Sequence, residues 1–266
     1  RVGAVRASGQ RAREGSAQHR AFHVLALLAL TALPTPSVAR CADLALVLAI
    51  DASGSIGEAE FKIQLQGYAA AFRSHDVQQA IRSVGDVDVA VVLWADGEMA
   101  AQVQPFRDVS SISAALDLAD RILQIQRTVT GNTGIGRGLW TALDLIEYDR
   151  PCAHRRVVNV SGDGKESKAP RSRSQITLAA ARARAELLDV TVNALAIQSE
   201  IKDLADWYSK HLLTGSGAFV MGIADLSSFA ASIERKLVRE IAHPMLAGTG
   251  VDDLPPLAPN LGSSRH

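Results

Sequence analysis

The stretch "LALVLAIDASGSIGEAEF", residues 44–61, changes character abruptly at its eighth position. An uninterrupted apolar run stops at Asp51, and Ser53 and Ser55 follow with Gly54 between them. A continuous apolar run is typical of a strand that is buried on both faces of a sheet. The carboxylate and hydroxyls that follow it have two interpretations: turn and capping chemistry between a strand and a helix, or oxygen ligands for a cation. The stretch by itself leaves both open.

Similar apolar runs recur along the chain and alternate with amphipathic segments. Besides 43–50, strands are predicted at 87–94, 99–106, 155–161, 190–197 and 217–223, and helices at 58–74, 110–125, 139–148, 174–189, 204–213 and 225–242. Asp96-Gly97 is too short a connection for a crossover, so the strand at 99–106 is expected to run antiparallel. The pattern predicts a doubly wound α/β fold: a mostly parallel six-stranded sheet with one antiparallel strand and helices on both faces.

In such sheets ligands bind at the carboxyl ends of the strands, which directs attention to the loops that follow them. Three of these loops are rich in oxygen-bearing side chains and glycine: residues 51–55, 130–134 ("TGNTG") and 161–164 ("SGDG"). They contain no His and no Cys. An all-oxygen set suits a hard cation such as magnesium, manganese or calcium and does not suit zinc or copper.

Asp-x-Ser-x-Ser after the first buried strand, a later Gly-x-Thr loop and a later Asp-Gly together resemble the von Willebrand factor A domain. The resemblance covers residues 43–243. The segments "FKIQLQGYAAAF", "VSGDG" and "GAFV…KLVREIA" are more narrowly similar to a bacterial exported subgroup of A-like domains whose function is uncharacterised. The resemblance implies the family's Rossmann-like fold and a metal-ion-dependent adhesion site.

Carried over residue by residue, the resemblance implies that Asp51, Ser53, Ser55, Thr133 and Asp163 hold Mg²⁺, with Mn²⁺ or Ca²⁺ as alternatives. Ser53 and Ser55 would be direct ligands, whereas Asp51 and Asp163 would act partly or wholly through water. A carboxylate from a partner protein would complete the coordination. The chain departs from the usual family pattern at Asn132, where a second glycine is common, and at Ser161-Gly162, where a threonine usually precedes Asp-Gly.

The N-terminal segment has the order of a secretory signal peptide: a basic stretch, the apolar run "AFHVLALLALTAL", then prolines and small residues. We expect cleavage after Ala39, so that residues 1–39 are removed. The alternative is that the segment is not cleaved and anchors the protein, in which case it would be the protein's only contact with the membrane. Residues 43–243 would form the A-like domain, and residues 244–266, which lack periodicity, a disordered tail. The protein is then periplasmic or secreted.

The chain has two cysteines, Cys41 and Cys152, and export would favour a bond between them. They precede Asp51 and Asp163 by similar lengths of chain, and the family's strand order makes the two strands neighbours. Both cysteines should then lie at the opposite edge of the sheet, within bonding range. Two free thiols remain the alternative.

Other functional classes have less support in the sequence. Lys plus Arg equals Asp plus Glu, at 28 each, so nothing indicates the positive field of a nucleic-acid-binding protein. "DASGSIG" does not match the nucleophile elbow of a serine hydrolase, and "TGNTGIGRG" lacks the Lys of a phosphate-binding loop. We therefore expect an exported, metal-dependent protein-binding module and no enzyme, with a metal-assisted hydrolase on the same fold as the alternative.

Overall fold

A computed structural model describes residues 41–150, 152–167 and 176–242. Its sheet has six strands in the order β3-β2-β1-β4-β5-β6. Only the β2–β3 pair is antiparallel. The predicted fold class is therefore confirmed. The strands are β1 (Ala42–Asp51), β2 (Val87–Trp94), β3 (Gln102–Asp108), β4 (Ala153–Gly162), β5 (Thr191–Ile197) and β6 (Val220–Ile223).

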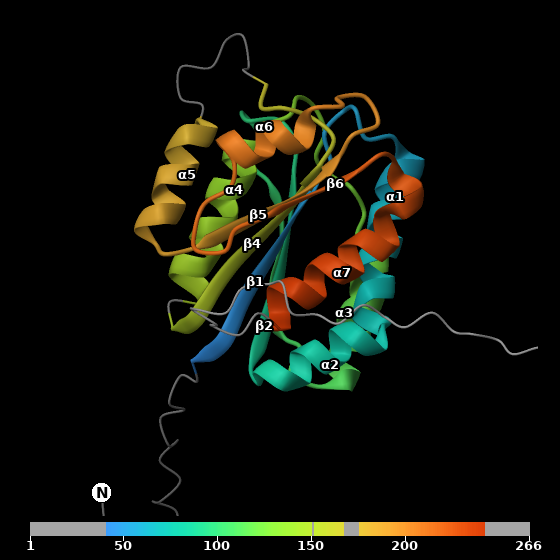
Figure 1. Cartoon of the computed structure of the whole chain (residues 1–266), viewed down its shortest axis with the longest axis vertical. Coiled ribbons are helices and arrows are strands. Elements are labelled where there is room, and N and C mark those ends of the chain that lie inside the picture. Colours follow the sequence, from blue (N-terminus) through green and yellow to red (C-terminus); the bar gives the residue numbers. More distant parts are fainter. Residues whose placement is uncertain (1–40, 151, 168–175, 243–266) are drawn as a thin grey trace, which may run out of the picture. The chain divides into compact units, whose positions relative to one another are not determined.

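Helices cover both faces of the sheet (Figure 1). One face packs against α1 (Glu58–Arg73), α2 (His75–Val84), α3 (Ile112–Leu123) and α7 (Phe229–Ala242), and the other against α4 (Ile135–Asp144), α5 (Leu178–Leu187) and α6 (Leu204–His211). The central strand β1 contributes to both cores, because Leu46 and Leu48 face one layer while Val47 and Ala49 face the other. This two-sided burial explains the continuous apolar run. No helix among the described residues is long and apolar enough to span a membrane.

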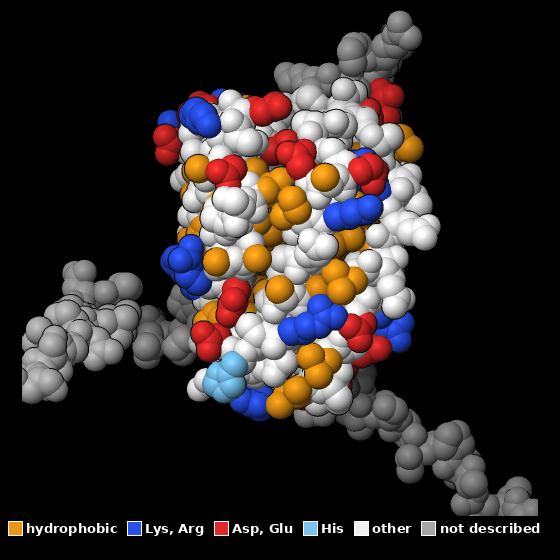
Figure 2. Space-filling model, turned by 90° about the vertical axis from the view of Figure 1, so that its right-hand side faces the viewer, with side chains coloured by type: hydrophobic (Ala, Val, Ile, Leu, Met, Phe, Trp, Pro, Cys, Tyr) orange, Lys and Arg blue, Asp and Glu red, His pale blue; other side chains and the backbone are white. Residues whose placement is uncertain are grey.

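The outer surface of the α1, α3 and α7 layer carries both signs of charge (Figure 2). Acidic and basic side chains are interspersed there with apolar areas. Ile63 on α1 and Leu116 and Leu123 on α3 are exposed. This mixture agrees with the balanced composition, since no broad field of one sign covers this face.

Two helix boundaries show what local capping decides. The helix expected at 58–74 ends at Arg73, and α2 follows at once, which the periodicity did not predict. Ser74 makes the break: it adopts an extended backbone, and its side chain accepts a hydrogen bond from the Val77 N–H (3.2 Å). At α3, Ser111 is the cap, accepting from the Ala114 N–H (3.1 Å), whereas Ser110 accepts from the Val87 N–H (3.0 Å) and so ties this loop to β2.

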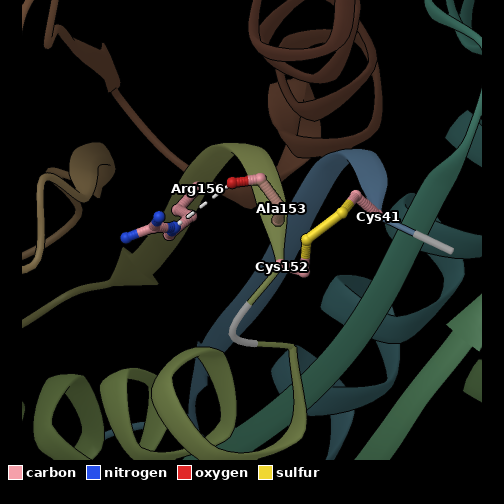
Figure 3. The surroundings of a disulfide bond; sticks show 4 residues. All are labelled: Cys41, Cys152, Ala153 and Arg156. Atoms are coloured by element: carbon pink, nitrogen blue, oxygen red, sulfur yellow. Dashed lines mark hydrogen bonds between the residues drawn. A yellow bond between two sulfur atoms is a disulfide. The ribbon is translucent and has the colours of Figure 1, made fainter. Parts of the chain in front are cut away.

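Cys41 and Cys152 form a disulfide, as predicted, with their Cα atoms 4.7 Å apart (Figure 3). They directly precede β1 and β4, and the next residues, Ala42 and Ala153, are paired in the sheet. The bond therefore joins two neighbouring central strands at their amino ends. It closes a loop with a sequence separation of 111 residues. The chain-entropy model gives such a loop about 4–5 kcal/mol of stabilisation.

Helix α7 contains a buried ion pair, Lys236–Glu240, that is hydrogen-bonded to the sheet. The Lys236 Nζ donates to Glu240 Oε1 at 2.5 Å, and both side chains are fully buried. On the sheet, Asn159 Nδ2 donates to the second oxygen of Glu240 (2.6 Å). Tyr68 on α1 lies with its hydroxyl 3.2 Å from Asn159 Oδ1. Because each charge is matched by a partner at close range, the pair is tolerated in an otherwise apolar layer.

We predict that Lys236→Met lowers the free energy of unfolding by about 3–5 kcal/mol, because it leaves the Glu240 carboxylate buried without its counter-charge. Urea-induced unfolding measures the change. Lys62→Met, at an exposed position of α1, is the matched control and should change stability by less than about 0.5 kcal/mol. Equal stabilities of the two variants would contradict a structural role for the buried pair.

Candidate metal centre

The first loop of the site begins where β1 ends. Asp51 is fully buried, and its Oδ1 accepts a hydrogen bond from the Ser53 N–H at 2.8 Å. This contact folds the chain back within two residues, as Asp does in turns. The turn places Ser53 Oγ 3.2 Å from Ser55 Oγ. Ser53 is buried and Ser55 is exposed, so the loop leads from the interior to the surface.

The second loop is held between the first loop and the β2–β3 connection. The Gly54 N–H donates to Gly131 O (2.7 Å), and the Gly134 N–H donates to Ala95 O (2.7 Å). Gly131 has a φ of 120°, which side-chain-bearing residues rarely adopt. Asn132 Nδ2 donates to Asp96 Oδ2 (2.9 Å). The Asn132 departure from the family pattern is thus an anchor for the loop.

The third loop follows β4 and meets the other two. Ser55 Oγ donates to Asp163 Oδ1 at 2.8 Å, which links the first and third loops directly. A Cβ atom at Gly164 would lie 3.0 Å from Thr133 Oγ1, so the Thr133 hydroxyl lies against this loop. The structure therefore joins Asp51, Ser53, Ser55 and Asp163 in one hydrogen-bonded chain and places Thr133 beside it.

The electrostatics of the site centre on Asp51. Burial, together with the nearby negative charge of Asp163, raises the pKa of Asp51 to about 7. The second carboxylate oxygen of Asp51, Oδ2, is buried and has no hydrogen-bond partner. Burial also raises the pKa of Asp163, and the charges of Glu200 and Glu60 contribute to that shift. A buried carboxylate oxygen without a donor is costly, and a cation would offset that cost.

The residues present fit a hard cation. Among the described residues no group of three or more His, Cys, Asp and Glu side chains converges, and this centre has only two carboxylates, Asp51 and Asp163. Its remaining donors are hydroxyls, which suit magnesium or manganese better than softer metals. Gly162 leaves the space that the carboxylate needs, because a Cβ atom there would lie 2.8 Å from Asp51 Oδ2.

Several residues around the centre were not predicted. Gln64 on α1 donates to the Asp51 carbonyl (3.3 Å), and Tyr208 on α6 donates to the Gly164 carbonyl (2.9 Å). Ser167 contacts Thr133 in the second loop, and Glu166 contacts the first turn of α4, which follows that loop. Gln64 had a sequence signal, since it is a polar residue on the apolar face that Phe61, Leu65 and Tyr68 define. The other three lie in segments whose local pattern says nothing of their partners.

The sheet order, the helices on both faces, the loops that follow β1 and β4 and the loop that precedes α4 define a von Willebrand factor A-like fold. A family model described as "Protein of unknown function (DUF1194)" matches residues 40–245, and the chain belongs to this family. A search of curated proteins returned no match.

Solved structures support the same fold. The pilus adhesin SpaC from Lactobacillus rhamnosus GG, in its open conformation, is similar with a TM-score of 0.55 at 12% identity, over 76% of this chain and 31% of that chain. Proximal thread matrix protein 1 from the mussel byssus gives 0.53 at 18% identity, over 76% and 47%. A structure of the same protein with zinc in its metal-ion-dependent adhesion site (MIDAS) motif has a TM-score of 0.52 at 17% identity, over 76% of this chain and 46% of that chain. The chain thus spans a third to a half of these proteins.

We predict that the free energy of unfolding, measured in EDTA, depends on pH because of Asp51. Its pKa is about 7 when folded against an ordinary value of 3.8, so the folded protein holds this proton more tightly. The resulting stabilisation is complete below the ordinary value and is lost as the pH rises through about 7. Because one pKa unit corresponds to about 1.4 kcal/mol, the loss reaches at most about 4 kcal/mol. Asp51→Asn should flatten this decline.

Urea-induced unfolding at pH 4 to 8 in EDTA measures the effect. Asp76→Asn, at an exposed position of α2, is the control and should keep the wild-type slope. Parallel pH profiles for wild type and Asp51→Asn would show that the buried carboxylate does not titrate in this range.

Proposed function

We propose that this protein is an exported module that binds a partner protein through a divalent cation held by Asp51, Ser53, Ser55, Thr133 and Asp163. The observation that carries the proposal is the buried, unpartnered Asp51 Oδ2 where the loops after β1 and β4 meet. A carboxylate in this position has no protein donor to neutralise it. A cation would supply the missing partner and would also organise the exposed Ser55 hydroxyl.

The proposed ligands explain why such an ion would bind a partner protein. Mg²⁺, with Mn²⁺ or Ca²⁺ as alternatives, would meet only two carboxylates and three hydroxyls here. When bound, the ion supplies Lewis acidity that is only partly neutralised by the protein. A carboxylate from the partner protein would then complete its coordination, because hard cations favour oxygen ligands. Ser55, at the exposed end of the loop, would lie closest to that partner.

Two further observations support a binding role outside the cytoplasm. The Cys41–Cys152 disulfide is typical of proteins in oxidising compartments. The similar solved structures include a pilus adhesin and a proximal thread matrix protein of the mussel byssus. The proposed signal peptide, residues 1–39, and the proposed tail, residues 244–266, lie outside the described residues. Of the proposed domain, residues 43–243, the structure describes 43–150, 152–167 and 176–242.

We predict that Mg²⁺ or Mn²⁺ raises the melting temperature of the wild-type protein. A cation at about 100 times its Kd stabilises the folded state by about 2.7 kcal/mol. Asp51→Ala should abolish the rise, whereas Asp76→Ala, at an exposed position of α2, should keep it. Differential scanning fluorimetry with and without EDTA measures this. An undiminished metal response in Asp51→Ala would falsify the site.

We predict that the immobilised domain retains a partner from an envelope extract in Mg²⁺ and releases it in EDTA. Asp51→Ala should retain none, and Lys62→Met should behave as wild type. Mass spectrometry of the eluates identifies the partner. The same preparation should not hydrolyse phosphoesters or peptides; robust turnover that depends on both Mg²⁺ and Asp51 would establish the metal-assisted hydrolase instead.

A further inference from the structure

The segment directly after Asp163, residues 164–167, is held at every position: its first two residues contact α6 or the N-cap of that helix, and its last two contact the second loop or α4. The Gly164 carbonyl accepts from the Tyr208 hydroxyl of α6 (2.9 Å). Lys165 Nζ lies 2.9 Å from both carboxylate oxygens of Asp203. Ser167 contacts Thr133 in the second loop, and Glu166 contacts the first turn of α4. The segment that follows the third loop of the site therefore contacts the second loop of the site.

Ser167 contacts both polar groups of the Thr133 backbone. Its hydroxyl accepts from the Thr133 N–H (2.8 Å) and also lies 3.1 Å from the Thr133 carbonyl oxygen. The Ser167 N–H donates to that same carbonyl (2.8 Å). Thr133 lies between glycines at 131 and 134, and Gly-rich backbone has many accessible conformations. Three contacts from one residue restrict the peptide that carries the Thr133 side chain.

Glu166 fixes the helix that begins just beyond Thr133. Its Oε2 accepts a hydrogen bond from the Gly136 N–H (3.0 Å), in the first turn of α4. A carboxylate is favourable there because the amino end of a helix carries partial positive charge. Burial raises the pKa of Glu166 to about 7, although the backbone N–H groups of Gly136 and Ile135 oppose this shift. The start of α4 and Thr133 are thus both attached to the segment that follows Asp163.

We infer that Glu166 and Ser167 are positioning residues. They orient the Thr133 hydroxyl toward the cation, and they attach the second loop and the start of α4 to the segment that follows Asp163. The inference rests on the proposed cation site and goes beyond it, because neither residue belongs to the ligand set. Gly164 completes the arrangement, since the hydrogen in place of its Cβ lets Thr133 Oγ1 approach the third loop. Partners of this kind orient metal ligands, and their loss typically costs 10- to 100-fold in metal affinity.

The test measures Mn²⁺ affinity by isothermal titration calorimetry in wild type, Ser167→Ala and Ser167→Thr. Ser167→Ala should bind Mn²⁺ about 10- to 100-fold more weakly. Ser167→Thr keeps the hydroxyl and should recover most of the affinity. Ser110→Ala is the matched control, because Ser110 is also half-buried and accepts a backbone N–H, at the opposite end of β2. It should bind Mn²⁺ as wild type does.

A second readout separates positioning from a general loss of structure. In the metal-free protein, hydrogen exchange at the Thr133 amide should accelerate in Ser167→Ala and not in Ser110→Ala, while the melting temperatures of the two variants stay close. If Ser167→Ala fails to fold, Glu166→Ala tests the same attachment through α4 and should also weaken Mn²⁺ binding.

The outcomes distinguish the inference from the proposed function. No Mn²⁺ binding by the wild type would overturn the cation site itself. Wild-type binding together with unchanged affinity in Ser167→Ala would leave the cation site standing and overturn the positioning role. Equal losses in Ser167→Ala and Ser110→Ala would also overturn it, because the effect would then be a general one.

Discussion

The carboxylate of Asp51, at the end of β1, has to be stabilised by the groups that surround it. It is fully buried in the central strand of the sheet, and one of its oxygens has no donor. Burying a charge without compensation is among the most costly arrangements in a protein, so the fold must provide compensation or leave a place for it. The Ser53 N–H meets one oxygen, and the proposed cation would meet the other.

The two strands that lead to the carboxylates of the site, β1 and β4, are connected to each other at both ends. At their amino ends the disulfide joins Cys41 to Cys152, and at their carboxyl ends Ser55 joins Asp163. Between these points β1 and β4 are paired in parallel register. The relative position of the first and third loops therefore follows from a covalent bond and a continuous ladder. The second loop follows a helix instead of a strand of the sheet, which is why its position needs the contacts of Glu166 and Ser167.

A buried polar chain also links the site to α7. Gln64 contacts the Asp51 carbonyl, and Ser161 Oγ lies 3.5 Å from Gln64 Oε1. Tyr68 lies 3.2 Å from Ser161 and from Asn159, which in turn contacts Glu240. Because each of these groups is paired, the chain does not offer Asp51 an alternative partner for its free oxygen.

Local periodicity and turn residues were enough to predict the six strands, the antiparallel strand, the three polar loops and every α-helix except α2. The resemblance it carries also brought together Asp51, Ser53, Ser55, Thr133 and Asp163 as a candidate site, and it supported the disulfide pair. Their role as metal ligands stays a prediction. Periodicity missed the break at Ser74, although that break rests on local capping: Ser74 ends one helix by capping the next. The burial of the Lys236–Glu240 pair and the attachment of Thr133 to Ser167 depend on tertiary packing, because these groups owe their effect to burial and to partners in other elements. Such contacts leave no periodic trace in the chain, because they exist only once distant segments have packed together.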